Sequence, residues 1–320
     1  MKKLSAALLI LLIPAALLCA YDPRLTAMGG IGVGVSGTGM LSYTNPAAVF
    51  FDDNPYTFAL STSVADVVGL DPWPCNPTSS LEALFTASLV TAGIDVTYNA
   101  VNRRENAHVD VIQDVKLDVD ICAGYGMISA GVGVTGGSQM QRLDVPMDDL
   151  TDFPVQTLFA PFDRVVNSEF IQLRAGVMLR LGQFHIGVLL DDLLKKTDSG
   201  MTFQWDAIFQ GTGTGVYWSS PEYSARGRMN NFLFSAGAEV TNIFNAEDRR
   251  FSAGTEVRFR FTRTAGVSIR AGYTSLLASF GSGTVTTGAG ADFGPVSVGL
   301  NADFPIGGNP VLRATVIALI

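Results

Sequence analysis

Several stretches of this 320-residue chain alternate between apolar and polar side chains with a period of two. Between Asp114 and Ile121, valine, leucine or isoleucine occupies every second position, and aspartate or lysine occupies the others. Because successive side chains of a β-strand point to opposite faces, such a stretch has one apolar and one polar face. The same alternation recurs at 171–181, 256–261, 267–273 and 296–304. The sequence therefore predicts an all-β protein.

The length of these runs separates two all-β architectures. Strands of soluble sandwiches average about five or six residues, whereas the runs here reach about ten, the length that crosses a bilayer at a tilt of about 45°. Aromatic residues also stand beside turns at the ends of runs, as at Phe184 and Phe293. This placement is typical of the interfacial girdles of outer-membrane barrels. We therefore favour a transmembrane antiparallel β-barrel over a secreted sandwich.

Turn residues divide residues 56–320 into strands of this predicted outer-membrane barrel. About 14 strands are expected, an even number as in bacterial single-chain barrels. They are placed at 56–67, 81–90, 94–102, 110–123, 126–136, 170–181, 184–191, 201–209, 229–241, 251–262, 267–276, 284–293, 295–304 and 311–320. Connections after even-numbered strands are tight and the others are long, as expected for periplasmic turns and external loops.

The connection at 210–228 breaks this rule because it is long where a tight turn is expected. Two explanations stay open. The eighth strand lies nearer 214–218 than 201–209, or the barrel has an unusual inner loop.

The chain opens with the layout of a secretory signal peptide. Two lysines precede an apolar run from Leu4 to Leu18, and the small residues Cys19 and Ala20 follow. We expect residues 1–20 to be cleaved. The alternative is lipidation at Cys19, against which the bulky Leu18 argues. In both cases the mature chain leaves the cytoplasm.

Charge and residue types exclude several partners and chemistries. The net charge of −8 argues against binding to nucleic acid. Cys75 and Cys122 form either one disulfide or two buried free thiols. His108 is predicted in an external loop and His185 on the polar face of a strand, and the chain has no nucleophile elbow, P-loop or metal-binding motif. We therefore expect no enzyme, no metal and no cofactor.

Two stretches, Gly32–Gly37 and Gly131–Gly136, match the spacing G-x-G-x-x-G. A dinucleotide site also needs a preceding buried strand, a following helix and an acidic residue about 20 positions on. The first match leaves little room for a helix before Pro46, and the second lies inside an alternating strand. We therefore reject dinucleotide binding.

The glycine-rich leader at 24–53 resembles the N-terminal segment of the FadL-type outer-membrane transporters of long-chain fatty acids and other hydrophobic compounds. In that family an A-x-G-G run, a stretch of small residues and a tyrosine lead to Asn-Pro-Ala. The corresponding residues here are Ala27, Gly29, Gly30, Tyr43, Asn45, Pro46 and Ala47. The C-terminal phrases "SIRAGY", "TGAGADFG" and "SVGLNADF" add to the resemblance.

The resemblance implies that residues 21–55 form a small hatch inside the barrel formed by 56–320. The gating residues it implies are Gly29, Gly30, Tyr43, Asn45, Pro46 and Ala47. Glycine suits such a segment because it allows close backbone approach and positive φ. The alternative is a flexible leader, against which the apolar content of the segment argues.

The polar faces of the predicted strands carry charges of both signs. The residues expected to face the lumen are Asp118, Asp120, Arg174, Arg180, Arg258, Arg260, Arg270 and Asp292, and Glu256 and Asp303 fall on the same side. Because a buried charge needs a partner, some of them must pair across strands, which suits a cross-linked lumen better than a wide pore. The same arginines could instead receive a carboxylate head group.

The resemblance implies uptake across the outer membrane of a hydrophobic small-molecule ligand such as a long-chain fatty acid. Capture in an external apolar cleft would be followed by transfer to an inner site and by a hatch shift around Asn45 to Ala47. Two other functions stay open. One is a barrel that serves as a scaffold for a protein partner in secretion or surface attachment, and the other is a general diffusion porin. All three place the chain among outer-membrane lipids.

Overall fold

The computed structural model describes residues 23–35, 44–51, 56–67, 78–87, 89–103, 108–146, 165–191, 193–197, 200–203, 211–224 and 227–319. The predicted signal peptide at 1–20, the lipidation alternative at Cys19, the gating candidate Tyr43 and the thiol Cys75 lie outside these residues.

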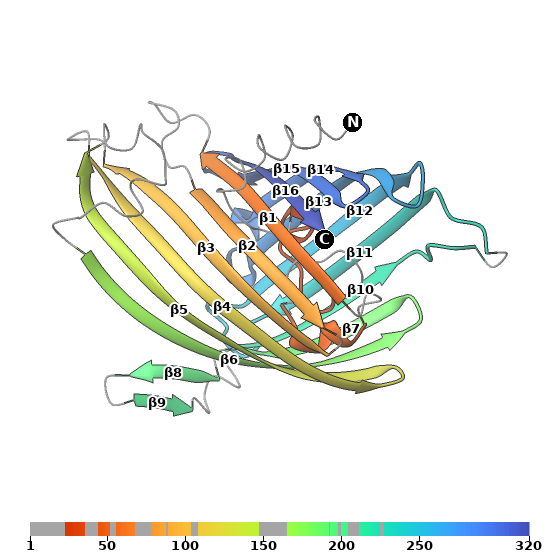
Figure 1. Ribbon diagram of the computed structural model, residues 1–320, viewed down its shortest axis with the longest axis horizontal. Coiled ribbons are helices and arrows are strands. Elements are labelled where there is room, and N and C mark those ends of the chain that lie inside the picture. Colours follow the sequence, from red (N-terminus) through yellow and green to blue (C-terminus); the bar gives the residue numbers. More distant parts are fainter. Residues whose placement is uncertain are drawn as a thin grey trace.

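Antiparallel β-strands make up most of the described chain and close into a barrel (Figure 1). The strand bounds are β1 (Tyr56–Val67), β2 (Thr78–Ala87), β3 (Val90–Arg103), β4 (His108–Tyr125), β5 (Ile128–Pro146), β6 (Val165–Leu181), β7 (Phe184–Leu190), β8 (Leu194–Thr197), β9 (Gly200–Phe203), β10 (Thr212–Ser219), β11 (Phe232–Thr241), β12 (Arg250–Arg260), β13 (Ala265–Leu276), β14 (Thr284–Phe293), β15 (Val296–Pro305) and β16 (Val311–Leu319). The prediction of an all-β antiparallel architecture is confirmed.

Neighbouring strands follow the order β1-β16-β15-β14-β13-β12-β11-β10-β7-β6-β5-β4-β3-β2, and β1 pairs with both β2 and β16. The strands β8 and β9 form a separate hairpin that projects beside β6 (Figure 1). No helix in the described ranges is long and apolar enough to cross a bilayer.

The alternation of side chains along the strands is reversed relative to a soluble protein. In β13 the apolar Ile269 is 70% exposed, whereas Ser268 and Arg270 on the opposite face are 3% and 6% exposed. The strand β7 repeats this arrangement, with Phe184, Ile186 and Val188 exposed, and His185 and Leu189 buried. The apolar faces therefore point away from the barrel, and most of the residues that point into it are polar or small.

The two ends of the barrel differ in the length of their connections. Tight turns at 126–127, 182–183 and 294–295 define what we call the short-turn end, which lies at the right of Figure 1. Each begins with a glycine at positive φ, namely Gly126 (60°), Gly182 (62°) and Gly294 (64°). Longer connections, including the six-residue 3₁₀ helix η3 (Leu277–Ser282), lie at the other end, the long-loop end.

The eighth barrel strand is β10 at Thr212–Ser219, so its prediction at 201–209 is wrong. Residues 200–203 belong to β9, while β10 pairs with β7 on one side and β11 on the other. The long connection to β11 remains, since 220–231 joins β10 to β11 at the short-turn end, and Tyr223 and Met229 form an isolated β-bridge within it. Both explanations suggested by the sequence therefore hold.

Other differences concern strand ends. The strand β5 extends to Pro146 and β6 begins at Val165, although the whole of 137–169 was predicted as a loop. His108 was also predicted in a loop, but it is the first residue of β4 and pairs with Arg103 of β3. Strands therefore reach further toward the long-loop end than their hydrophobic alternation does, because polar residues extend the ladders beyond the apolar band.

The apolar core of the molecule lies inside the barrel. It is built around what we call the N-terminal segment, residues 23–35 and 44–51, which contains the short helix α2 (Pro23–Ala27) and the 3₁₀ helix η1 (Pro46–Phe51). Met28, Ile31 and Val49 are almost fully buried there. Met178 and Tyr217 contribute to the same core from the barrel wall.

Candidate functional site

The N-terminal segment runs along a belt of glycines on the inner face of the barrel. Each of nine consecutive strands in the barrel order, β4-β5-β6-β7-β10-β11-β12-β13-β14, contributes at least one glycine at which a Cβ would meet this segment. This glycine belt consists of Gly124, Gly131, Gly176, Gly187, Gly213, Gly215, Gly237, Gly254, Gly272 and Gly288. The missing side chains create the space in which the segment lies.

Two of these contacts show how closely the backbones approach. A Cβ at Gly131 would lie 2.6 Å from the carbonyl carbon of Pro46. On β10, three strands further along the barrel order, a Cβ on Gly34 of the segment would lie 2.7 Å from the carbonyl carbon of Gly215. Only glycine allows backbones to pack this tightly.

Replacing Gly131 with valine is expected to displace Pro46 and Ala47 from the wall, because the new side chain would occupy the space of the Pro46 carbonyl group. Overpacking of this kind costs about 1–3 kcal/mol. Hydrogen–deuterium exchange of the amides in 44–51 is expected to accelerate. Gly136→Val is the matched control, since Gly136 lies on the same strand and a Cβ there would meet nothing within 4 Å. Equal exchange in the two variants would contradict the role of the belt.

Asn45 joins two parts of the N-terminal segment to the barrel wall. Its amide nitrogen donates to the carbonyl oxygens of Val33 (3.0 Å), Val188 (3.3 Å) and Val177 (3.4 Å). Its carbonyl oxygen accepts a hydrogen bond from the amide of Ala47 at 3.0 Å. Asn45 is fully buried, so each bond replaces one that water would otherwise make.

The other gating candidates lie on both sides of this anchor. Pro46 and Ala47 open η1, and the Ala47 carbonyl oxygen accepts a hydrogen bond from Ser129 Oγ at 2.7 Å. Gly29 and Gly30 follow α2 with φ values of 82° and 77°, a region that favours glycine. A Cβ at Gly29 would lie 2.8 Å from the Tyr273 carbonyl oxygen of β13, whereas one at Gly30 would meet nothing within 4 Å.

A second anchor was missed in the sequence. Glu239 of β11 is 8% exposed and accepts hydrogen bonds from the backbone amides of Gly32 (2.7 Å) and Val33 (2.8 Å). The one sequence feature that could have pointed to Glu239 was its place as an acidic residue on the inward face of a strand otherwise rich in small residues. Its partners lie more than 200 positions away in the sequence, so alternation alone could not identify them.

A buried ionic cluster ties α2 to β12 and β13. The Glu256 carboxylate lies 2.9 Å from Arg24 Nε and 2.9 Å from Arg270 Nε. Arg24 also donates to the Tyr217 hydroxyl at 2.7 Å. Arg258 lies 3.6 Å from Glu256 and 3.9 Å from Asp292. The predicted residues Arg258, Arg270 and Asp292 are thus brought together, around a carboxylate that the strand pattern had placed on the same face.

A separate cluster brings together Asp118, Asp120 and Arg174 on β4 and β6. Arg174 donates to both oxygens of Asp120, at 3.0 and 3.2 Å, and lies 3.4 Å from Asp118. Asp118 also accepts a hydrogen bond from Thr135. This cluster links strands of the wall and includes none of the described residues of the N-terminal segment.

The two remaining candidates, Arg180 and Arg260, stand apart from these clusters. Arg260 pairs with Glu222 of the 220–231 connection at 3.2 Å. Arg180 lies over the Phe51 ring, with its guanidinium carbon 5.8 Å from the ring centroid. Cys122 is a buried free thiol. In the part of the chain that the structure describes, no group of His, Cys, Asp or Glu could hold a metal ion.

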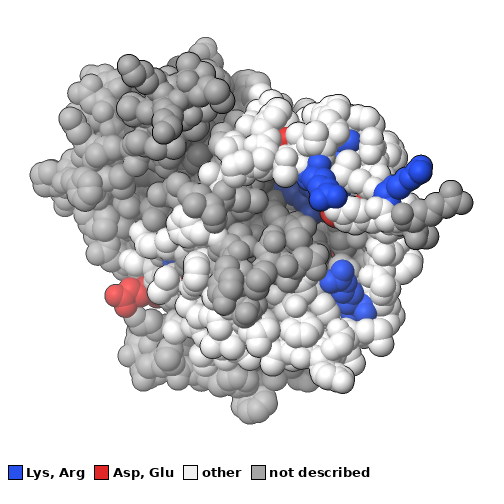
Figure 2. All heavy atoms as spheres, turned by 45° about the vertical axis from the view of Figure 1, so that its right-hand side comes forward, with Lys and Arg blue, Asp and Glu red and all other residues white. Residues whose placement is uncertain are grey.

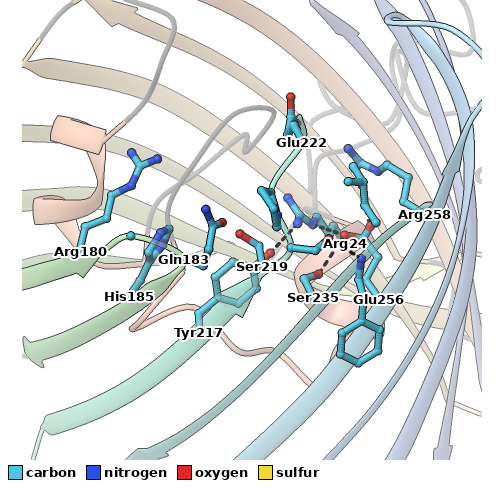
Figure 3. A pocket seen from close by; sticks show the side chains of 15 residues that line it. Arg24, Arg180, Gln183, His185, Tyr217, Ser219, Glu222, Ser235, Glu256 and Arg258 are labelled. Atoms are coloured by element: carbon cyan, nitrogen blue, oxygen red, sulfur yellow. Dashed lines mark hydrogen bonds and ion pairs between the residues drawn. The ribbon is translucent and has the colours of Figure 1, made fainter. Parts of the chain in front are cut away.

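A pocket of about 230 Å³ opens at the short-turn end, where α2 meets the wall. Its walls come from the 182–183 turn, the 220–231 connection and inward-facing residues of β7, β10, β11 and β12. Arg180 and Arg258 stand on opposite sides, with Arg24, His185 and Glu222 between them (Figure 3). Figure 2, with the right-hand side of Figure 1 turned forward, shows several basic side chains on this face.

Comparison with known proteins identifies the fold. No family model and no curated protein match the chain. Among solved structures, the chain is similar to the CymD monoaromatic hydrocarbon channel, with 12% identity and a TM-score of 0.61 over 94% of this chain and 98% of that one.

Two further solved structures are similar to this chain over nearly its whole length. The toluene transporter TodX of Pseudomonas putida has 11% identity and a TM-score of 0.51, covering 94% of this chain and 97% of its own. A FadL homologue of Pseudomonas aeruginosa has 10% identity and a TM-score of 0.52, with 94% and 98% covered. At these identities the likeness establishes the fold alone, and it extends over nearly the whole chain.

Proposed function

We propose that the protein is an outer-membrane barrel of about 14 strands that takes up hydrophobic small molecules such as long-chain fatty acids. The observation that carries this proposal is a barrel with an apolar outer face and a lumen filled by its own N-terminal segment. Related folds include channels named for monoaromatic hydrocarbons and for toluene, which supports a hydrophobic cargo.

The outer surface supports a position in a membrane. Exposed aromatic side chains stand at the short-turn end of successive strand pairs, at Tyr125, Phe184, Phe232, Phe261 and Phe293. Between this rim and the long-loop end most outward residues are apolar, as at Ile269 and Leu300. An apolar band edged by aromatic residues is what a bilayer with its two interfaces requires.

The filled lumen supports gated passage rather than free diffusion. The N-terminal segment is anchored through Asn45, Glu239 and Arg24, and it packs against the glycine belt. A general porin needs a clear water-filled lumen, which this packing does not leave. In our proposal the segment acts as the hatch that the sequence suggested, with residues 21–55 as its extent and Tyr43 among its gating residues.

The anchors suggest which part of the hatch moves. Asn45 and Ala47 are held by directional hydrogen bonds to β5, β6 and β7, and such bonds can be exchanged for bonds to water or ligand at small net cost. Arg24 is held by a buried ion pair, which is costly to break. We propose that cargo captured from the long-loop end passes when the Asn45 to Ala47 turn shifts, while α2 stays attached.

Deleting residues 21–47 while keeping the signal peptide is expected to change uptake of a labelled long-chain fatty acid and of toluene by cells, while the barrel stays folded. The strand ladders do not depend on these residues for their backbone hydrogen bonds. Heat-modifiable mobility on a gel would report barrel folding, and conductance in planar bilayers would report an opened lumen. Unchanged uptake by a folded deletion variant would contradict the gating role.

Mass spectrometry of apolar molecules co-purified from native outer membrane, against a mock preparation, tests the cargo. Enriched fatty acid or hydrocarbon supports the proposal. A stoichiometric protein companion with no enriched lipid would instead support the scaffold function, and steady conductance of the full chain would support the diffusion porin.

A further inference from the structure

We propose that the pocket at the short-turn end binds a small organic carboxylate. This inference does not depend on the cargo of the barrel, because it rests on the charges and walls of the pocket itself. It concerns a site built where α2, the 182–183 turn and the 220–231 connection meet.

The first observation concerns Arg180, whose guanidinium has no polar partner in the described part of the chain. Its guanidinium lies over the Phe51 ring and makes neither a hydrogen bond nor an ion pair with any residue that the structure describes. A guanidinium presents five donors in a planar fork that matches a carboxylate. On the wall of a pocket, these donors are available to a ligand.

The second observation concerns Arg258 on the opposite side of the pocket, whose ion pairs are long. Its Nη2 lies 3.6 Å from Glu256 and its Nε lies 3.9 Å from Asp292. Both distances exceed those of N–H···O hydrogen bonds. The Nε atom is buried and has no hydrogen-bond partner within the described ranges. A buried donor without an acceptor is destabilising, and a bound carboxylate would supply the acceptor.

The charge balance around the pocket favours an anion. The pocket wall holds Arg24, Arg180 and Arg258 against Glu222 and Glu256. Each of these two carboxylates also forms an ion pair with an arginine outside the pocket wall, Glu222 with Arg260 and Glu256 with Arg270. Positive charge is therefore in excess here, in a chain whose net charge is −8. Such a local excess attracts anions and disfavours cations.

The size and walls of the pocket define the rest of the ligand. About 230 Å³ is below the roughly 300–1,000 Å³ of pockets for drug-sized ligands, so a long acyl chain does not fit. Leu233, Pro221 and the Tyr217 ring offer apolar contact, while Ser219 and Gln183 offer hydrogen bonds. The pocket therefore suits a compact carboxylate whose body contacts these few apolar residues within an otherwise polar wall.

Benzoate is a suitable probe, and benzamide is its neutral counterpart of the same shape. Isothermal titration calorimetry of the full chain in detergent at low ionic strength is expected to show saturable binding of benzoate and none of benzamide. R180Q and R258Q are each expected to weaken binding at least tenfold. R180Q removes no hydrogen bond or ion pair within the described chain, so it keeps the test valid if R258Q does not fold.

Arg313→Gln is the matched control, because Arg313 pairs with Asp303 at 3.4 Å and does not line the pocket. Its benzoate affinity is expected to equal that of the unchanged protein. The proposal is overturned by absence of saturable benzoate binding, by equal binding of benzamide, or by equal losses in R180Q and R313Q. Binding of inorganic phosphate but not benzoate would also overturn it.

Discussion

Replacing Asn45 with aspartate is expected to release the N-terminal segment from the wall at neutral pH while the barrel stays folded. The Asn45 amide nitrogen donates to three carbonyl oxygens, and an aspartate carboxylate would place negative charge against the same oxygens. A buried charge without a partner costs several kcal/mol. Asparagine and aspartate have nearly the same shape, so the effect would come from the lost donor and the added charge rather than from packing.

Conductance in planar bilayers is the readout, because a released segment no longer fills the lumen. The N45D variant is expected to conduct steadily, with unchanged heat-modifiable mobility, whereas N45A is expected to show a smaller effect. Asn309→Asp makes the same chemical change at an exposed position in the connection between β15 and β16 and should not conduct. If N45D does not conduct, and the amides of residues 44–51 stay protected from hydrogen–deuterium exchange, Asn45 is not an anchor.

The E256Q variant is expected to lose about 3–5 kcal/mol of stability, the usual cost of removing one partner from a buried ion pair. Arg24 and Arg270 would both lose the carboxylate that lies 2.9 Å from them. The Glu256 side chain is 4% exposed, so water would compensate for its loss poorly. Denaturant unfolding in detergent, followed by tryptophan fluorescence, measures the change.

Asp303→Asn is the control for E256Q, since its pair with Arg313 is longer (3.4 Å) and both side chains are partly exposed. It is expected to cost less, because it breaks a single longer pair and not a carboxylate shared by two guanidinium groups. The double variant R24Q/E256Q should be more stable than the sum of its single variants predicts, because the two residues interact directly. Simple additivity would mean that Arg24 and Glu256 do not form the pair described.

Hydrophobic alternation identified most strands because it records which face of a strand meets an apolar environment. The prediction at 56–67 coincides with β1, and that at 284–293 with β14. It failed at β10, where Gly213 and Gly215 occupy inward positions and leave a weak pattern. Gly215 lacks a side chain because the backbone at Gly34 lies against it. The identity of that inward residue is thus set by a segment some 180 positions earlier.

In the candidate site, too, some contacts follow from the strand pattern and others do not. Alternation placed Arg270 and Glu256 on one face, and the register of β12 and β13 pairs them directly, so their contact follows from a single hairpin. The contact of Glu256 with Arg24 does not, because it joins the first described helix to a late strand. Local patterns therefore predicted which residues are polar and inward, but not how the N-terminal segment pairs with them.

The path of the N-terminal segment constrains the order in which the molecule can assemble. Its anchors span long sequence separations, from 82 residues between Ala47 and Ser129 to 259 between Ala27 and Thr286. Contacts of this kind form late, because the intervening chain must be ordered first. No hairpin or half-barrel offers the whole docking surface. The part of this chain that is synthesised first therefore completes its native contacts last, inside a wall that is already nearly closed.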